Sequence, residues 1–585
     1  MKIFDITLPS DDCASRERLY YRASKGAVAN SGSIRLSKGE VLSLDTYFNI
    51  LSCKYFKYTV IDILDVSLKF KGEIIFSVFL RTPDGDRLLA KQTSSAQDIG
   101  RVSISLRCDA MPEVGYIFIE IESLGDGVEI YGGEFSSDVP VRPVKAGVVI
   151  CTYKREQFVY DNMRRLQEYI DKTPFFCNKA GIFVIDNGRS VQPQYLPPQV
   201  KLVPNDNTGG AGGFTAGIKL VADSCEYTHF ILMDDDIAFE PEIVDRTVSL
   251  LAILRQEYKN ACIGGAMLLK DDPCVLHELG GKWMGDSVKG ALIDIDVSKA
   301  ENLMECELNR RADYNAWWYM CMPISAVDKF GLPLDKLFVK EDDVEYGLRC
   351  CKDNLILVSG IAVWHENFDY KYNGYYEYFV KRNEMIVNAL HPKRKGALSQ
   401  CMKLIRCVGR ALVEQRYFIA DIIFKAYKDY FKGWEYICGI NSAQLISDLA
   451  HLCPEYISKE EAQELCGVDL DKSRQDAMQA RGNMFIQALS LNGYLLPRRK
   501  YRAVSVTDMV KPKPVNLYKS DSVIHYNPYT ATAFVTKIDK KQLLRVGGKL
   551  VKALFKLFFG YYCIRRSYRR DIKSYIARSK SEADK

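Results

Sequence analysis

Three consecutive carboxylates, Asp234, Asp235 and Asp236, follow an apolar run, Phe230 to Met233, that is typical of a buried strand. Like charges held this close repel one another, and a cation relieves the repulsion. In an open α/β sheet the carboxyl ends of the strands also form the edge where ligands bind. The triplet therefore predicts a divalent metal site. The alternative is an acidic turn before a helix, because Glu240 to Glu242 encloses a proline and is typical of a helix start.

The elements that must position this triplet are short apolar runs that alternate with helical stretches from Ala146 onward. This alternation predicts a nucleotide-binding sheet in a mixed α/β region. Polar side chains stand directly after the first three runs, so we expect them beside the acidic triplet at one edge of the sheet. They are Thr152, Lys154 and Arg155 after the first run, Asp186 and Asn187 after the second, and Asn205, Asp206 and Asn207 after the third.

A glycine-rich segment, Gly209 to Phe214, opens a predicted helix after the third run. Glycines at this place, Gly210 among them, allow backbone N–H groups and the helix N-terminus to approach a diphosphate. The spacing is neither GxGxxG nor a P-loop, so the sequence disfavours dinucleotide and ATP binding. A plain flexible loop remains the alternative.

A second acidic cluster, Glu341, Asp342 and Asp343, precedes a helix expected to begin near Val344. A carboxylate at a helix N-terminus is held rigidly and could act as a general base. The helix N-terminus lowers the pKa of such a group, whereas burial and neighbouring acids raise it, so the sequence leaves its basicity open. The alternative role is helix capping, for which Asp is favoured.

Three further positions carry side chains suited to sugar or metal binding. The adjacent indoles of Trp317 and Trp318 could stack on sugar rings, with core packing as the alternative. His365 follows a predicted strand, Leu355 to Val363, and is a candidate metal ligand. Glu278, in the segment HELGG, could contribute to an acceptor site.

Taken in chain order, these motifs resemble those of polymerising bacterial galactofuranosyltransferases, which are inverting enzymes of glycosyltransferase family 2. The resemblance covers about residues 1 to 395 in motifs and domain order. Beyond residue 395 only the helical character of the chain agrees. The motifs are TYKR at 152–155, DNG at 186–188, Asn207 followed by GGAGGF, DDD at 234–236, WW at 317–318, DDVEYGLR at 342–349 and WH at 364–365.

The resemblance implies a glycosyltransferase A-type catalytic domain that binds a UDP-sugar together with Mn²⁺ or Mg²⁺. Asp234, Asp236 and His365 are expected to hold the metal, and mixed carboxylate and imidazole ligands suit such a cation. Asp343 is expected to be the catalytic base. The residues expected to bind the donor are Thr152, Arg155, Asp186, Asn207, Gly210, Asp234 and Asp235. Those expected to bind the acceptor are Trp317, Trp318, Asp342 and Glu278.

The chain of 585 residues, 47% of them hydrophobic, is long enough for three or four folded domains. Alternation of apolar and polar residues, as in Val102 to Arg107 and Ile117 to Glu122, predicts an N-terminal two-sheet β-sandwich of jelly-roll type. Asn516 to Tyr529 is expected to be irregular. The predicted domains are the sandwich at 1–142, the catalytic domain at 143–395, a helical domain at 396–540 and a basic amphipathic tail at 541–585.

Cellular location is predicted from the cysteines and from the apolar segments. The 18 cysteines are scattered without CxxC spacing, which indicates reduced thiols in a cytosol. The N-terminus carries no apolar segment of signal-peptide length, and no run of about 18 uncharged apolar residues occurs that could span a bilayer. We therefore expect a cytoplasmic protein.

The net charge of +6 conceals a basic tail, because residues 541–585 carry 13 Lys and Arg against 3 Asp and Glu, which leaves −4 on residues 1–540. Leu543 to Ile564 mixes apolar and basic residues and ends in Tyr561 and Tyr562, a composition typical of a helix lying on an anionic membrane. The alternative is a helix packed on the preceding helical domain. Nothing else in the chain supports nucleic-acid binding.

The sequence as a whole predicts a metal-dependent, inverting galactofuranosyltransferase. It would transfer galactofuranose from UDP-galactofuranose to a lipid-linked glycan in cell-surface polysaccharide synthesis, at the inner face of the membrane. The alternatives are a rhamnosyltransferase that uses a dTDP-sugar and a non-catalytic glycan-binding scaffold. Intact Asp234, Asp236, Asp343 and His365 argue against a decayed scaffold. Whether the chain forms a homo-oligomer is left open.

Overall fold

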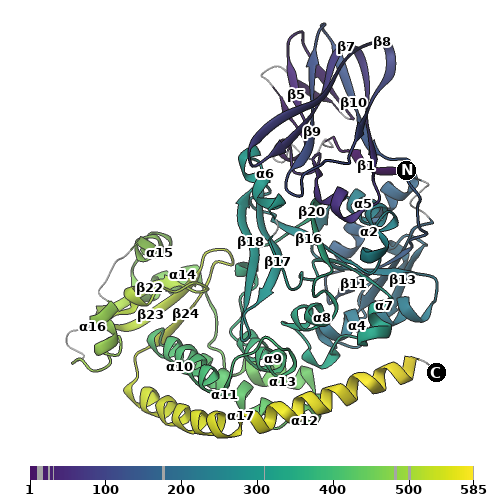
Figure 1. The fold of residues 1–585 in the computed structure, drawn as a ribbon. Coiled ribbons are helices and arrows are strands. Elements are labelled where there is room, and N and C mark those ends of the chain that lie inside the picture. Colours follow the sequence, from purple (N-terminus) through teal and green to yellow (C-terminus); the bar gives the residue numbers. More distant parts are fainter. Residues whose placement is uncertain are drawn as a thin grey trace.

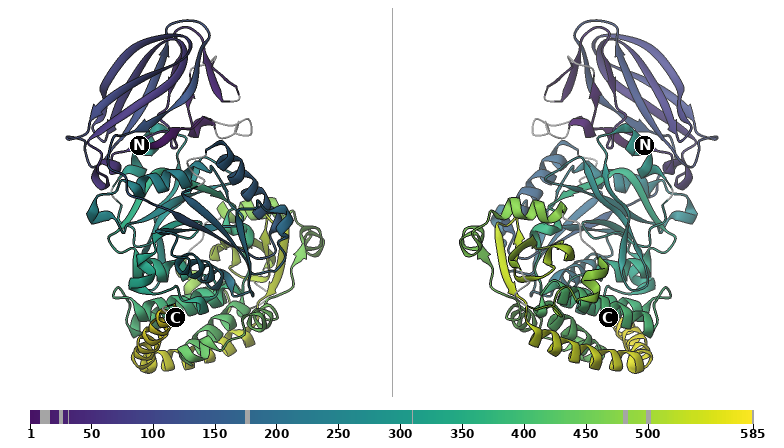
Figure 2. Two further views of the ribbon diagram at one scale, coloured as in Figure 1. Left: turned by 90° about the vertical axis from the view of Figure 1, so that its right-hand side faces the viewer. Right: turned by 90° about the vertical axis from the view of Figure 1, so that its left-hand side faces the viewer.

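The computed structural model describes residues 1–8, 17–23, 27–30, 32–173, 178–308, 310–479, 484–497 and 502–583. A β-rich N-terminal region lies at one end, an α/β body in the middle, and helices with a small sheet at the other end (Figures 1 and 2). The chain is thus a mixed α/β protein, as predicted.

Hydrogen bonds join all the strands described before residue 137 into one sheet. Its centre is a long antiparallel hairpin of β7 and β8, and β7 pairs with β10 along its first half and with β9 along its second. The strands are β1 (Lys2–Ile6), β2 (Arg22–Ala23), β3 (Val28–Asn30), β4 (Ser33–Leu36), β5 (Val41–Ser43), β6 (Leu51–Ser52), β7 (Ile63–Thr82), β8 (Gly85–Arg107), β9 (Tyr116–Ser123) and β10 (Val128–Ser136), with η2 (Glu17–Leu19) and α1 (Lys54–Tyr58) between them.

The predicted alternation along these strands is confirmed. Val102, Ile104 and Leu106 are buried while the residues between them are exposed, because successive side chains of a strand point to opposite faces. The all-β content of the region is therefore as expected. Its division into two separate sheets is not confirmed, since one hydrogen-bonded sheet contains all of these strands.

The N-terminal region shares one hydrophobic core with the α/β body. The predicted boundary at residue 142 therefore marks a change in the sequence pattern, but it does not separate two hydrophobic cores. Polar contacts cross the same junction. Lys54 Nζ donates to the carbonyl of Cys306 at 2.8 Å, and Arg246 donates to the carbonyl of Phe48 at 2.8 Å. The β-rich region is thereby fixed on the body.

The body is built on a second sheet of order β13-β12-β11-β14-β19-β16-β17-β18, with β20 beside β16 and β15 beside β20. The four strands from β13 to β14 are mutually parallel, and β19 runs antiparallel to β14. The strands are β11 (Ala146–Thr152), β12 (Ala180–Asp186), β13 (Val200–Pro204), β14 (His229–Asp234), β15 (Ala238–Phe239), β16 (Cys262–Leu269), β17 (Val275–Trp283), β18 (Val288–Asp296), β19 (Tyr319–Pro323) and β20 (Leu355–His365).

Helices connect the strands of this sheet. They are α2 (Glu156–Lys172), α4 (Gly209–Asp223), α5 (Glu242–Ala252), α6 (Ala300–Glu307), α7 (Ser325–Phe330), α8 (Asp342–Cys350) and α9 (Tyr376–Leu390), with the short turns η3 (Pro193–Tyr195), η4 (Gln256–Tyr258), η5 (Asp335–Leu337) and η6 (Phe368–Lys371). Helix–strand alternation around a largely parallel core is the arrangement that the sequence pattern predicts.

The C-terminal part contains the predicted helices and also a four-stranded sheet of order β21-β24-β23-β22. The helices are α10 (Ala397–Val413), α11 (Tyr417–Tyr430), α12 (Trp434–Cys438), α13 (Ser442–Ala450), α14 (Lys459–Cys466), α15 (Leu470–Gln479) and α16 (Met484–Leu489). The strands are β21 (Ile457–Ser458), β22 (Arg502–Asp508), β23 (Ser520–Asn527) and β24 (Thr532–Lys537), with η8 (Pro514–Leu517) before β23.

The expectation of an irregular segment from Asn516 to Tyr529 is therefore wrong, because β23 occupies most of it. This strand is buried on both faces, and His525 is fully buried with its ring stacked on Phe534. A strand buried on both faces has no polar alternation to reveal it.

The tail forms one helix, α17 (Lys540–Ala583), along the base of the molecule in Figure 1. One face packs on α9 to α12 and buries Val546, Leu557, Tyr561, Tyr568 and Ile572. The packed-helix alternative is thus confirmed for this face. Among the described helices, none combines the length and apolar character needed to cross a membrane.

Candidate active site

The polar residues predicted to meet at one sheet edge do so. Parallel pairing places Thr152 opposite Asp186, and Cys151 opposite Asp234. The acidic triplet therefore lies beside the ends of β11 and β12, at the carboxyl edge of the parallel strands.

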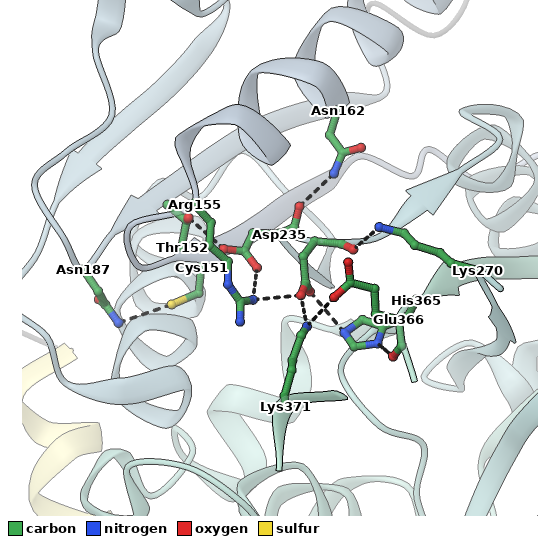
Figure 3. A network of polar contacts seen from close by, with 11 residues as sticks. Cys151, Thr152, Arg155, Asn162, Asn187, Asp235, Lys270, His365, Glu366 and Lys371 are labelled. Carbon is green, nitrogen blue, oxygen red and sulfur yellow. Dashed lines mark hydrogen bonds and ion pairs between the residues drawn. The ribbon is translucent and has the colours of Figure 1, made fainter. Parts of the chain in front are cut away.

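Asp235, the middle residue of the triplet, is fixed by the first βα turn (Figure 3). Its carboxylate accepts hydrogen bonds from Thr152 Oγ1 at 2.8 Å and Arg155 Nη1 at 2.9 Å, and its carbonyl accepts one from Asn162 at 2.9 Å. Burial raises the pKa of Asp235, against the opposing charge of Arg155. Thr152 and Arg155 thus hold the triplet in place, a role that the sequence reasoning did not foresee.

Asp234, Asp236 and His365 form a cluster whose candidate ligand atoms lie within 4.8 Å of one another. The pairing of β15 with β20 brings this about, because Ala238, just after the triplet, lies opposite Trp364. His365 Nε2 is 3.1 Å from Asp236 Oδ1. The structure therefore brings together the three residues predicted to bind metal.

The orientation of His365 fits a metal ligand. Its Nδ1 lies 2.5 Å from the carbonyl of Glu366, an acceptor, so Nδ1 carries the proton and Nε2 faces the carboxylates. Metal-binding histidines usually donate their second N–H to a carbonyl or carboxylate in this way. Two carboxylates and an imidazole suit Mn²⁺ or Mg²⁺.

Cationic side chains surround Asp236 in this structure. Arg155 Nη1 lies 3.0 Å from Asp236 Oδ2, and the ammonium of Lys371 forms an ion pair with the same oxygen. Burial raises the pKa of Asp236, but its hydrogen bond with His365 and the nearby positive charges outweigh burial and hold the pKa well below the ordinary value. Burial raises the pKa of Asp234 to about 6. Asp236 thus stays ionised, as a metal ligand must be.

The cluster forms part of the wall of a cavity of about 300 Å³. Lys340, Lys371, Phe368 and Tyr376 line it as well, and none of them was picked out from the sequence. Lys340 Nζ lies 5.1 Å from the centre of the Phe368 ring. The lysines carry no motif of their own, so only their position next to the cluster marks them.

Asp342 and Asp343 begin α8, two residues before the helix start expected near Val344, at the end of a loop with unusual backbone geometry. Phe338, Lys340 and Glu341 have φ values of 69°, 68° and 63°, which non-glycine residues seldom adopt. Such strain costs about 1–3 kcal/mol per residue and persists only where surrounding structure enforces it.

The enforcing contacts come from α9. Asn383 Nδ2 donates to the carbonyls of Leu337, Val339 and Lys340 at 3.1, 3.0 and 2.8 Å, and Arg382 donates to the carbonyl of Leu337 at 2.7 Å. Arg382 and Asn383 are both buried. The two residues clamp the loop that carries the second acidic cluster.

The pKa values of Asp342 and Asp343 in this second cluster are raised above the ordinary value. Burial raises the pKa of Asp343 to about 6, and burial together with Asp343 raises the pKa of Asp342 to about 7. Burial, with Asp343 second, raises the pKa of Glu278 on β17 to about 7. Glu278 and Asp343 are therefore close enough to influence each other, and a raised pKa makes Asp343 a better base near neutral pH.

The glycine-rich segment lies within the first turns of α4, which rules out the flexible-loop alternative. Gly209 has φ of +70°, and a Cβ there would meet the Phe338 carbonyl oxygen at 2.1 Å. Gly210 lies beside Asp342, whose Oδ2 would be 3.8 Å from an added Cβ. The helix start thus lies against the clamped loop.

Asp186 and Asn207, both predicted to bind the donor, accept hydrogen bonds from backbone N–H groups of the turns in which they lie. Asp186 accepts hydrogen bonds from the backbone of Gly188, Ser190 and Val191 at 2.9, 2.7 and 2.8 Å. Asn207 is exposed and accepts one from Gly209 N at 3.2 Å. Their roles toward a donor stay predictions.

Trp317 and Trp318 are buried, with 4% and 6% of their surface exposed. Trp318 donates to the carbonyl of Gly265 at 2.9 Å, and the Trp317 ring packs edge-on against Phe214 at 5.3 Å. The structure favours core packing over an exposed platform for stacking, and a part in acceptor binding stays a prediction.

No family model matches the chain. Its curated relatives nonetheless define a class, the glycosyltransferases. Both of these relatives are galactofuranosyltransferases named GlfT2. That of Mycolicibacterium smegmatis is 26% identical over 392 residues, which cover 61% of this chain and 59% of the relative. That of Mycobacterium tuberculosis is 25% identical over 447 residues, covering 71% and 68%. The predicted resemblance is confirmed, although the chain spans only about three fifths of the first relative.

Solved structures add little. A Pyrobaculum calidifontis mannosyltransferase in complex with GDP-Man and Mn²⁺ gives a TM-score of 0.27 at 10% identity, over 43% of this chain and 66% of that one. A carbohydrate-binding module from Clostridium stercorarium, in complex with cellobiose, gives 0.15 at 13% identity, over 20% and 87%. TM-scores this low carry no argument.

Proposed function

We propose that the protein is a metal-dependent, inverting galactofuranosyltransferase that uses UDP-galactofuranose. The observation that carries the proposal is the cluster of Asp234, Asp236 and His365 at the carboxyl edge of a parallel sheet, in a chain similar to galactofuranosyltransferases. The acceptor is a glycan, in the proposed setting one attached to a lipid carrier.

In this proposed reaction each group of residues has a separate role. Asp234, Asp236 and His365 hold Mn²⁺ or Mg²⁺, which when bound neutralises the diphosphate of the donor. Thr152 and Arg155 hold Asp235 and so position the cluster. The start of α4, with Gly210, and Asn207 bind the donor, and Asp186 shapes the donor site by fixing the turn after β12.

Asp343 takes the proton from the acceptor hydroxyl while the hydroxyl oxygen attacks the anomeric carbon of galactofuranose. The bond to UDP breaks on the opposite side, so the configuration inverts. The raised pKa of Asp343, about 6, supports this role. Asp342 and Glu278, whose pKa values are both raised by burial and by the charge of Asp343, orient the acceptor hydroxyls.

The decisive experiment offers the purified protein a panel of nucleotide sugars with Mn²⁺ and a short glycan acceptor, and follows nucleotide release. UDP release from UDP-galactofuranose is expected. Release from a dTDP-sugar alone would make the protein a rhamnosyltransferase, and no release from any donor would favour the non-catalytic scaffold.

We also propose that the enzyme works at an anionic membrane surface in the cytoplasm, through α17. The face of this helix opposite its packed side exposes apolar residues, with Val551, Phe555 and Phe559 each about two-thirds exposed. Exposed Leu398 and Met402 of α10 extend the apolar area, and α10 packs on α17. Lysines and arginines beside it suit a bilayer interface.

This docking differs from the free tail expected from the sequence. Tyr561 is buried and donates to Asn388 Oδ1 at 2.7 Å, so it cannot reach a bilayer, whereas Tyr562 is half exposed. Removing residues 541–585 would uncover the core of α9 to α12. A deletion therefore cannot distinguish loss of membrane binding from loss of folding. Point substitutions on the exposed face do.

A further inference from the structure

A cavity of about 610 Å³ lies between α11 and α17, apart from the candidate active site. Its apolar part is formed by Phe424, Tyr427, Phe431, Leu452 and Ala553. Its polar lining is almost entirely cationic, and it consists of Lys425, Lys428, Lys432, Lys549, Lys552, Lys556, Asp421 and Asp429.

Six lysines against two aspartates leave this lining with a net charge of +4. Both carboxylates are already neutralised. Asp429 contacts Lys425 at 3.1 Å and Lys432 at 3.0 Å, and Asp421 contacts Arg545 at 2.7 Å and Lys549 at 2.8 Å.

Three lysines remain without an acidic partner among the residues that the structure describes. They are Lys428, Lys552 and Lys556, of which Lys556 lies 4.9 Å from the centre of the Phe431 ring. Unpaired ammonium groups gathered around one cavity attract an anion, and phosphate suits lysine. An apolar floor beneath them favours a ligand that also carries hydrocarbon.

The position of the cavity on α17 identifies the source of such a ligand. Successive residues of a helix are turned by about 100°, so the stripe of Lys549, Lys552 and Lys556 borders the exposed apolar stripe that contains Phe555 and Phe559. A helix lying on a bilayer by its apolar stripe would present this cavity to the lipid headgroups.

We propose that the cavity between α11 and α17 binds the phosphate headgroup of an anionic membrane lipid, with Lys428, Lys552 and Lys556 around the phosphate and the glycerol and first acyl carbons against Phe424 and Phe431. The proposal deepens the membrane association proposed above, from which it takes only the source of the ligand. It does not depend on the sugar-transfer reaction.

Calorimetric titration of the full chain with a water-soluble lipid tests the site without a membrane. Dihexanoyl phosphatidic acid should bind saturably, one molecule per chain, while dihexanoyl phosphatidylcholine should not. Inorganic phosphate should bind about 10-fold or more weakly than the lipid, because it gains nothing from the apolar floor. Equal affinity for inorganic phosphate and the lipid would overturn the lipid assignment.

Substitutions separate a built site from diffuse attraction. Lys428→Gln with Lys552→Gln should weaken binding of the lipid about 10-fold or more. The matched control removes two exposed lysines elsewhere, by Lys91→Gln on β8 and Lys537→Gln on β24, and should leave binding unchanged. Ala553→Phe fills the cavity at constant charge and should also block binding, with thermal melting confirming the fold. Equal losses in both double variants would contradict the proposal.

These variants also keep the two proposals apart. UDP release from a nucleotide sugar with a soluble acceptor should be retained in Lys428→Gln/Lys552→Gln, since neither residue lies in the candidate active site. Absence of transferase activity in the wild-type chain would leave the titration result unaffected.

Discussion

The carboxylates of the candidate active site differ in strength because their surroundings differ. Asp236 lies among Arg155, Lys371 and His365, and these partners hold its pKa below the ordinary value. At Asp343 burial raises the pKa to about 6, because the Val344 backbone N–H and the charge of Lys340 favour the ionised form but do not offset burial. The first environment keeps a ligand charged, and the second makes a base that is effective near neutral pH.

Asp343→Asn should therefore remove the base while keeping its size. We expect kcat to fall by about 10²- to 10⁴-fold, the usual contribution of a general base, with UDP affinity little changed. Steady-state kinetics and UDP titration measure the two quantities. Asp342→Asn is the matched control. If Asp342→Asn is inactive and Asp343→Asn is active, the base is Asp342.

The pH profile gives a second test of the same residue. A base acts in its deprotonated form, so kcat should rise as pH increases through about 6 and level off above it. The rise should disappear in Asp343→Asn and persist in Glu278→Gln. Loss of the rise in Glu278→Gln instead would assign the titration to Glu278, whose pKa lies at about 7.

Much of this residue set could be predicted from sequence, and part could not. The triplet and His365 could be predicted because the triplet follows an apolar run and because the resemblance to galactofuranosyltransferases gives these residues roles in one site. Lys371 and Lys340 are ordinary lysines in the sequence, and only the fold brings them to the cavity. The burial of the two tryptophans could not be predicted, since an adjacent pair of indoles signals size but not exposure.

At the scale of elements, the site depends on contact between α9 and the loop before α8. Arg382 and Asn383 are adjacent in the sequence, but their partners are backbone carbonyls 43 to 46 residues away. Carbonyls have no sequence signature, so the clamp could not be predicted. Strand β23 was missed for a related reason, because burial on both faces removes the alternation by which strands are recognised.

Asn383→Ala should release the clamp. The carbonyls of Val339 and Lys340 lose the Asn383 donor, whereas that of Leu337 keeps Arg382. The loss costs about 1–3 kcal/mol for each group left unsatisfied, and the strained loop can then relax. We expect kcat to fall at least about 10-fold with a smaller change in UDP affinity, while circular dichroism still reports a folded protein. An unaltered kcat in a destabilised but folded variant would reduce Asn383 to a purely structural residue.

At the scale of the whole molecule, the four predicted regions are less separate than the sequence suggests. The N-terminal sheet and the α/β body share one core, and α17 packs back onto α9 to α12. Changes of composition mark the boundaries between these regions in the sequence, but composition does not record which surfaces bury one another. The amphipathic pattern of α17 indicated two possible surroundings, and the structure gives it a packed face and an exposed apolar face.

The exposed face of α17 predicts membrane binding. Phe555→Ser with Phe559→Ser removes two side chains that are each 68% exposed, and each contributes about 1.5–3 kcal/mol when buried in a bilayer interface. Co-sedimentation with anionic vesicles should fall at least about 10-fold, with activity on a short soluble acceptor retained. The control is Leu88→Ser with Ile99→Ser, two exposed apolar residues of β8. Equal vesicle binding by both double variants would contradict docking through α17.

The central claim, metal-dependent galactofuranosyl transfer, is tested most directly by mass spectrometry of a defined glycan acceptor incubated with UDP-galactofuranose. Wild-type protein with Mn²⁺ should add galactofuranose. Excess chelator should abolish the product and restored Mn²⁺ should recover it, whereas folded Asp236→Ala should give none under either condition. Full product formation in excess chelator, or in Asp236→Ala, would contradict the account.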